Sequence, residues 1–239
     1  MGKIIIGNWK MNKGGADGIA LLKKIVQEAT TSCKVIICPP YTILREVVDL
    51  IQKKQSSILA GAQDCSAFVQ GAHTGEVSVG ILSDIGVTHV LIGHSERRQM
   101  GEGASQIHAK LKAALEGGVH PVLCVGESAK DYAQGLTNKV LEKELTECLG
   151  NLPVQFIAYE PLWAIGSGKT PSWAEIGRIH DFIKAKVQSL TGYKPKVLYG
   201  GSVTPMNSAE ILALETVDGV LVGGASLEAE SFLKIGKNA

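Results

Sequence analysis

Eight short runs of apolar, mostly β-branched residues recur along the chain, and they constrain the possible folds more than any other feature. Each run is shorter than a typical helix and is almost continuously apolar, which is typical of strands in a parallel sheet buried on both faces. The runs cover residues 4–7, 35–38, 58–62, 89–93, 122–125, 156–160, 197–200 and 219–222. We therefore predict eight buried parallel strands.

The segments between these runs show helical periodicity. Apolar residues recur at helical spacing within residues 19–26, 44–51, 107–115, 140–145 and 176–187. Strand and helix alternate with no linker, which predicts one α/β domain over residues 1–239. Eight such units in 239 residues favour a closed (β/α)8 TIM barrel, because that fold typically takes about 250 residues.

A doubly wound open sheet is the main alternative fold. It usually carries a GxGxxG motif after its first strand, and Gly7-Asn8-Trp9-Lys10 does not match that motif. One connection, residues 63–78, has little helical or strand period and contains Gly71 and Gly75. A loop of this length in a compact domain is usually functional.

Charge and cysteine content narrow the function classes. With 24 basic and 23 acidic residues the formal charge is +1, which gives no overall field for nucleic acid or an anionic membrane. No apolar run is long enough to span a bilayer. The five cysteines form no CxxC pair, which is typical of free thiols in a reducing cytosol. We expect a cytoplasmic protein that binds neither nucleic acid nor membrane.

Candidate catalytic residues follow from the rule that active residues of a parallel barrel lie at the carboxyl ends of its strands. Asn8 and Lys10 follow the first predicted strand, His94 follows the fourth, and Glu160 ends the sixth. A carboxylate at the barrel rim can serve as a general base or form a surface salt bridge, and Glu160 alone does not decide between them. His94 precedes a helix-like polar turn, whose partial positive charge disfavours a charged imidazole. Taken alone, His94 is more often a solvated or capping histidine.

Glycine-rich segments follow three of the strands. They are Gly166-Ser167-Gly168, Gly200-Gly201-Ser202 and Gly223-Gly224. Glycine lets backbone N–H groups approach an anion closely, and the last two loops of a barrel are its usual phosphate site. Any one segment is better explained as a tight turn, but three converging loops favour phosphate.

Several other kinds of site are excluded by single residues. Residues 163–170 resemble a nucleotide-binding P-loop, but Trp163 replaces its first glycine. Residues 93–97 resemble the nucleophile elbow of serine hydrolases, but Arg97 replaces its closing glycine. No histidine spacing typical of a metal site occurs, and we expect no metal.

Five motifs together resemble the triosephosphate isomerase family, in order along the whole chain. They are Asn8-Trp9-Lys10-Met11-Asn12, Gly93-His94-Ser95-Glu96-Arg97-Arg98, the segment from Tyr159-Glu160-Pro161 to Gly168-Lys169-Thr170, Tyr199-Gly200-Gly201-Ser202-Val203, and Leu221-Val222-Gly223-Gly224-Ala225. The resemblance implies a cofactor-free barrel enzyme that interconverts dihydroxyacetone phosphate and glyceraldehyde 3-phosphate.

The resemblance also implies roles for the site residues. Glu160 would move a proton between two carbons, and a neutral His94 would polarise the carbonyl; the family is a standard example of this pairing. Lys10, oriented by Glu96, would add positive charge, and Asn8 would shape the pocket. The phosphate-binding N–H groups would come from Gly166, Ser202, Gly223 and Gly224.

A lid and a homodimer are further implications of the resemblance. Residues 161–171 would form the lid, held by Tyr199 and Ser202 when closed and by a contact between Glu127 and Trp163 when open. Residues 63–78 would insert into a second subunit, where Thr74 would reach Asn8 and Lys10, and Glu76 would pair with Arg97. His73 departs from the aromatic residue usual at the tip of this loop.

Two other functions remain open at this point. One is another phosphate-binding barrel enzyme, such as a sugar-phosphate isomerase of amino-acid biosynthesis, which would lack the joint Lys10, His94 and Glu160 set. The other is a catalytically silent phosphate-binding protein, which need not keep a lid with two hinges.

Overall fold

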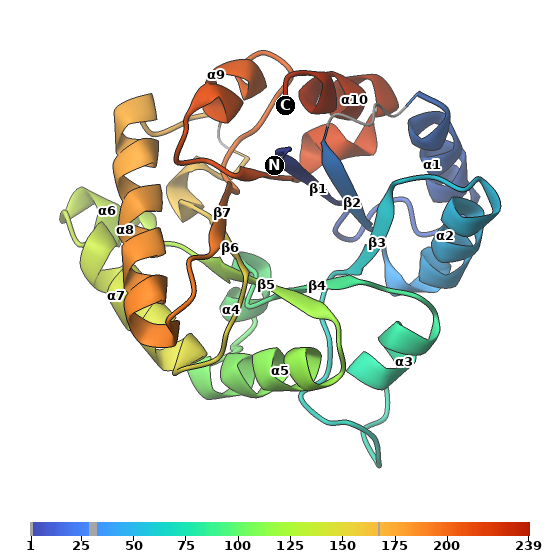
Figure 1. The fold of residues 1–239 in the computed structure, drawn as a ribbon, viewed down its shortest axis with the longest axis horizontal. Coiled ribbons are helices and arrows are strands. Elements are labelled where there is room, and N and C mark those ends of the chain that lie inside the picture. The colour runs from blue at the N-terminus through green and yellow to red at the C-terminus, as the bar shows by residue number, and fades with distance from the viewer. Residues whose placement is uncertain (1, 29–32, 167) are drawn as a thin grey trace.

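A closed parallel barrel forms the centre of the molecule (Figure 1). The computed structural model describes residues 2–28, 33–166 and 168–239. In these residues the strands pair in chain order, and β8 closes the barrel against β1. The strands are β1 (Ile4–Asn8), β2 (Lys34–Cys38), β3 (Leu59–Ala62), β4 (His89–Ile92), β5 (His120–Val125), β6 (Phe156–Tyr159), β7 (Lys196–Tyr199) and β8 (Gly219–Val222). The predicted barrel is confirmed, and the open-sheet alternative is wrong.

Strand boundaries differ slightly from the sequence prediction. Gly93, Glu160 and Gly200 were placed at strand ends but lie just beyond β4, β6 and β7. These residues leave the ladder because the chain turns there toward the rim. Glu160 therefore lies at the mouth of the barrel, with its backbone still tied to β5 by an N–H bond to the carbonyl oxygen of Val125 (2.8 Å).

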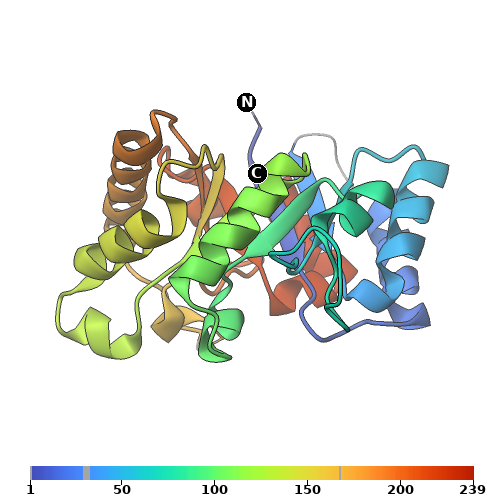
Figure 2. The same ribbon diagram turned by 90° about the horizontal axis from the view of Figure 1, so that it is seen from below.

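Helices form an outer layer around the strands, which the side view in Figure 2 shows clearly. The longer ones are α1 (Ala16–Glu28), α2 (Tyr41–Lys53), α5 (Ala104–Glu116), α7 (Thr137–Leu149), α8 (Trp173–Thr191) and α10 (Ala229–Lys237). The shorter ones are α3 (Val79–Asp84), α4 (Ser95–Gln99), α6 (Ala129–Ala133), α9 (Ser208–Ala213) and the 3₁₀ turns η1 (Leu162–Ala164) and η2 (Gly224–Leu227). All five periodic segments lie inside α1, α2, α5, α7 and α8. The shorter helices span too few residues to show a period.

The strands pack against two apolar cores, one on each face, and for this reason nearly all of their residues are apolar. Side chains alternate along each strand, so Ile4 and Ile6 of β1 point into the barrel while Ile5 packs outward against the helices. Both sets are buried, with at most 3% exposure for these three residues. The same alternation leaves the carboxyl ends of the strands free to carry polar side chains.

The loop of residues 63–78 contains no strand or helix and projects outward beyond the ring of helices (Figure 1). Its apolar side chains Phe68 and Val69 are 55% and 73% exposed. The ring of His73 stacks on Phe68 with centroids 3.8 Å apart. Apolar groups displayed on such a projection are typical of a docking surface. None of the helices described is both long and apolar enough to cross a membrane.

Candidate active site

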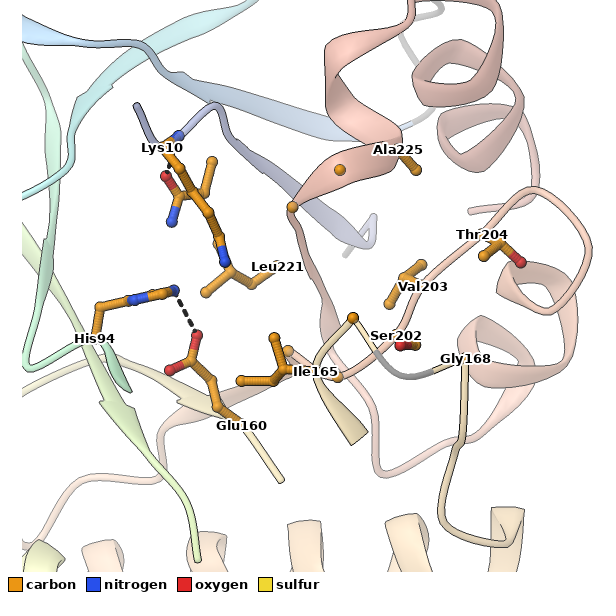
Figure 3. Close-up of a pocket in the computed structure, with 16 residues that line it drawn as sticks. Lys10, His94, Glu160, Ile165, Gly168, Ser202, Val203, Thr204, Leu221 and Ala225 are labelled. Atoms are coloured by element: carbon orange, nitrogen blue, oxygen red, sulfur yellow. Dashed lines mark hydrogen bonds and ion pairs between the residues drawn. The ribbon is translucent and has the colours of Figure 1, made fainter. Parts of the chain in front are cut away.

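A pocket of about 320 Å³ opens at the carboxyl ends of the strands. It is lined by every site residue that the sequence predicted, namely Asn8, Lys10, His94, Glu160, Gly166, Ser202, Gly223 and Gly224. Figure 3 shows Lys10, His94 and Glu160 pointing toward one another from three separate segments. Residues up to 217 positions apart in the sequence (from Asn8 to Ala225) thus share one cavity.

Glu160 and His94 lie in direct contact at the base of this pocket. Glu160 Oε1 is 3.1 Å from His94 Nε2, drawn as a dashed line in Figure 3. Its other oxygen accepts a hydrogen bond from the backbone N–H of Ser95 at 3.1 Å. Both residues are buried, with 3% exposure for Glu160 and 5% for His94. A carboxylate held this way is shielded from water and available to take a proton.

His94 also caps the helix that follows it. Its Nδ1 accepts the backbone N–H of Glu96 at 3.2 Å at the start of α4. An Nδ1 that accepts a hydrogen bond carries no proton, so in this arrangement the ring proton is on Nε2, facing Glu160. The sequence predicted a histidine at a helix start, and the structure shows that it is also the N-cap.

The electrostatics of this pair differ from the sequence expectation. Burial alone would lower the pKa of His94, but the charge of Glu160 and its hydrogen bond outweigh burial and raise this pKa above its ordinary value. Burial alone would raise the pKa of Glu160, but His94, Ser95 N–H and Lys10 together lower it. The prediction that the helix start keeps the pKa of His94 low is therefore wrong in this geometry, because the charge and hydrogen bond of Glu160 raise that pKa.

Lys10 is held in place by contacts at both ends. Its Nζ donates to Glu96 Oε1 at 2.8 Å, as the resemblance implies. Its backbone has φ of +52°, a strained region for a residue with a side chain, and strain of this kind is common at functional sites. Asn8 Oδ1 accepts the Lys10 N–H at 3.0 Å, and Gln63 Nε2 donates to the Lys10 carbonyl oxygen at 2.8 Å. These bonds fix a conformation that the chain would otherwise avoid.

Sequence reasoning missed Gln63 as a contributor to the site. Gln63 directly follows β3, so the strand-end rule could have identified it. It also donates to the carbonyl oxygen of Cys38 at the end of β2 (3.0 Å), and thus ties the ends of β1 and β2 together. The pocket is also lined by Ile165, Val203, Leu221 and Ala225, which the sequence analysis places in motifs without giving them a role, and by Thr204, which no motif includes.

The glycine loops converge on the side of the pocket opposite His94 (Figure 3). Gly166 and Gly168 have φ of +65° and +71°, which only glycine adopts without strain. Ser167, the residue between them in the predicted segment, lies outside the described residues. Gly223 packs toward Lys10, since a Cβ there would meet the lysine Cε at 3.5 Å. An anion among these loops would lie close to the lysine charge.

The predicted lid carries the contact assigned to its open form. Trp163 Nε1 donates to Glu127 Oε1 at 2.8 Å, and Tyr159 Oη donates to the same oxygen at 3.1 Å. The indole also stacks on Tyr132 of α6, with ring centroids 4.1 Å apart. Ser202 Oγ already donates to the lid at the carbonyl oxygen of Ala164 (2.6 Å). These contacts hold the first half of the lid against the barrel rim.

Within the described ranges, no group of three or more His, Cys, Asp or Glu side chains is arranged to hold a metal ion. The four cysteines at positions 38, 65, 124 and 148 are buried free thiols. Burial raises the pKa of Cys65 to about 12 and that of Cys38 even further, so these thiols are poor nucleophiles. Lys10, His94 and Glu160 are the ionisable side chains that line the pocket.

A closed parallel barrel with buried acid–base groups and a glycine-lined pocket at one mouth defines a (β/α)8-barrel enzyme. The family model described as triosephosphate isomerase matches residues 3–239. Curated relatives named triosephosphate isomerase include those of Endomicrobium trichonymphae, 40% identical over 98% of this chain and 97% of the relative, and Ruegeria sp., 42% identical over 96% and 95%. The crystal structure of triosephosphate isomerase from Bartonella henselae is 34% identical, with a TM-score of 0.91 over 100% of this chain and 99% of that one. The chain belongs to the triosephosphate isomerase family and is an isomerase.

Proposed function

We propose that the enzyme interconverts dihydroxyacetone phosphate and D-glyceraldehyde 3-phosphate by proton transfer through an enediolate. The observation that carries this proposal is the contact between Glu160 Oε1 and His94 Nε2 (3.1 Å) inside a pocket that also contains Lys10. The names of the relatives support the choice of substrate. Residues 1–239 act as one barrel domain in this proposal, with no cofactor.

Glu160 is the base in the proposed mechanism. Its carboxylate takes a proton from the carbon next to the substrate carbonyl, and the bonding electrons of that C–H bond move to form the enediolate. The same proton, or one from solvent, returns from Glu160 to the neighbouring carbon, while the hydroxyl proton of the first carbon passes to the oxygen of the second, so that the carbonyl and hydroxyl groups exchange places. The lowered pKa of Glu160 keeps it ionised and ready to accept the proton.

His94 is the electrophile in the proposed mechanism. Its Nε2–H donates to the substrate oxygen on which negative charge develops, in place of its present donation to Glu160. The Glu96 N–H at Nδ1 supports this assignment, because it favours a proton on Nε2 alone. Lys10 adds fixed positive charge beside the same oxygen, and such preorganised groups act strongly in a water-excluded site.

The phosphate group is held by backbone N–H groups in this proposal. Gly166, Ser202, Gly223 and Gly224 line one side of the pocket, and their small or absent side chains allow a close approach. Asn8 shapes the pocket between this side and Lys10. Closure of residues 161–171 over the substrate would exclude water and protect the enediolate.

Glu160→Gln tests the base, in a coupled assay that follows turnover of glyceraldehyde 3-phosphate. Glutamine keeps the shape of the side chain but cannot take the proton. We expect turnover to fall toward the upper end of a range of about 10²–10⁴-fold. Folding and affinity for inorganic phosphate should be retained. Near-normal turnover in the folded variant would rule out Glu160 as the base, and absence of turnover in the unaltered enzyme would reject the substrate.

We also propose that the active form is a homodimer. The exposed side chains of Met11, Phe68, Val69 and Met100, between 55% and 97% exposed, support this proposal. They belong to the loop of residues 63–78 and to the loops that follow β1 and α4. A second copy that covered these groups would remove apolar surface from water, including that of Met11, which directly follows Lys10.

A further inference from the structure

The two reacting side chains come from strands that do not touch. His94 follows β4 and Glu160 follows β6, and β5 lies between them in the barrel order. Their 3.1 Å contact therefore depends on how the ends of three strands are joined. A catalytic arrangement tolerates roughly 0.5 Å of misplacement, so whatever joins these ends matters for the chemistry.

Arg98 joins the ends of β4 and β5. Its Nε donates to the carbonyl oxygen of Gly93 at 2.8 Å, and its Nη2 donates to that of Cys124 at 2.9 Å. Gly93 precedes His94 directly and has φ of +69°, so its carbonyl fixes the direction in which the chain enters His94. The guanidinium is a rigid planar fork, and a lysine ammonium cannot reproduce both bonds at this spacing.

Glu144 of α7 extends this connection toward β6. Its Oε1 lies 3.4 Å from Arg98 Nη1, and its Oε2 accepts the backbone N–H of Gly126 at 2.9 Å. Gly126 lies directly against Glu160, since a Cβ on Gly126 would be 1.8 Å from the Glu160 carbonyl oxygen. Holding Gly126 therefore holds the backbone that carries the base.

We propose that Arg98 and Glu144 are positioning residues for the isomerase reaction, which lock the ends of β4, β5 and β6 so that His94 and Glu160 meet correctly. Neither side chain lines the pocket, so we expect both to act through the residues that they hold. The pair is largely buried, with side-chain exposures of 20% for Arg98 and 18% for Glu144. This inference rests on the proposed function, in which His94 and Glu160 carry the chemistry.

Steady-state kinetics of Arg98→Lys and Glu144→Gln test the inference. Arg98→Lys keeps the charge but loses the fork, and we expect kcat to fall by about 10–100-fold, as for a misplacement of roughly 1 Å. KM should change less than about threefold, because Arg98 does not contact the glycine loops. In Glu144→Gln the amide oxygen can still accept the Gly126 N–H, so kcat should fall less than in Arg98→Lys. In the double variant, kcat should fall by less than the product of the two single fold decreases, because both substitutions break the same connection.

Two measurements separate positioning from a merely structural role. The pH profile of kcat/KM should shift in Arg98→Lys, and so should the imidazole ¹⁵N resonances of His94, because the contact between His94 and Glu160 sets the pKa of both groups. Arg45→Lys is the matched control: Arg45 is 65% exposed and pairs with Asp49 on its own helix α2. It should leave kcat, KM and the His94 resonances unchanged.

Three results would overturn the inference. One is kcat within twofold of the unaltered enzyme in both folded variants. Another is a loss of kcat matched by an equal rise in KM, and the third is a lower melting temperature with an unchanged pH profile. If Arg98→Lys does not fold, Glu144→Gln decides. If Glu160→Gln is inactive and Arg98→Lys has the kcat of the unaltered enzyme, the positioning role of Arg98 is rejected and the proposed function stands. If Glu160→Gln is active, the proposed function itself is rejected.

Discussion

His94 is subject to two opposing influences on its charge. The Glu160 carboxylate raises the pKa of the ring, while the Glu96 N–H at Nδ1 opposes a second ring proton. We predict that Glu160→Gln lowers the pKa of His94, because it removes the negative charge that favours the imidazolium. NMR titration of ¹⁵N-labelled imidazole measures this directly. An unchanged or higher pKa in the variant would show that Glu160 is not the dominant influence.

Sequence reasoning grouped the candidate site residues at this scale, for a physical reason. Strand ends of a parallel barrel converge, so Lys10, His94 and Glu160 could be grouped without coordinates. What the sequence could not predict is which side chain faces which. The contact between Glu160 and His94 inverted the expected direction of the histidine pKa. Glu144 could not be found either, because it lies within a helix and nothing in the sequence distinguishes it from the exposed glutamates of the chain.

At the scale of elements, α6 restrains the first half of the lid. Tyr132 stacks on the Trp163 indole and its Oη donates to Glu175 Oε2 at 3.3 Å. We predict that Tyr132→Leu weakens the contact between Trp163 and Glu127, because the indole loses the aromatic ring that stacks on it. Tyr132→Phe keeps the ring and serves as the control. Faster exchange of the Trp163 indole N–H in the leucine variant, measured by NMR, is the expected result. Equal exchange in both variants would contradict this role.

The elements themselves were predictable where length allowed. All eight strands and the five helices with a clear apolar period were expected from the sequence. α6 and α9 were not, because five or six residues cannot display a 3.6-residue period. α4 was anticipated only as a polar turn, although its first residue follows the catalytic candidate His94. Two of these short helices lie beside the candidate site, because α4 begins directly after His94 and Tyr132 of α6 stacks on Trp163 of the predicted lid.

At the scale of the whole molecule, the loop of residues 63–78 is expected to determine assembly. We predict that removing about seven residues from its tip gives a folded monomer of much lower activity, because a second subunit no longer supports the segment of Lys10. Light scattering and sedimentation measure the mass of both proteins. The predicted pairing of Arg97 with Glu76 remains untested, and within the chain Arg97 Nε lies 3.1 Å from Asp64. Full activity of the intact protein as a monomer would contradict the dimer.

Two buried histidines are expected to make the whole molecule sensitive to acid. His89 and His180 are 2% and 0% exposed, and burial, followed by the charge of Lys34 for His89, lowers the pKa of each to about 3. In the unfolded chain both titrate near pH 6.5. Below this pH the unfolded state binds protons that the folded state does not. The free energy of unfolding therefore falls as the pH falls from 6.5, by about 1.4 kcal/mol per pH unit for each histidine.

His180→Phe isolates one of these contributions. The His180 ring packs edge-on against Tyr159 with centroids 6.1 Å apart, and phenylalanine fills a similar space without titrating. We predict that the variant loses about 2 kcal/mol less stability than the unaltered protein between pH 7 and pH 5. The comparison at pH 7 is the control, because position 180 is then largely neutral in the unaltered protein and in the variant, and the two proteins differ there only in packing. Asp64 and Glu144, whose pKa values burial raises, change stability in the opposite direction at lower pH but act equally in both proteins. Urea unfolding at one fixed protein concentration gives the two differences. Equal losses in the two proteins would show that His180 is protonated in the folded state.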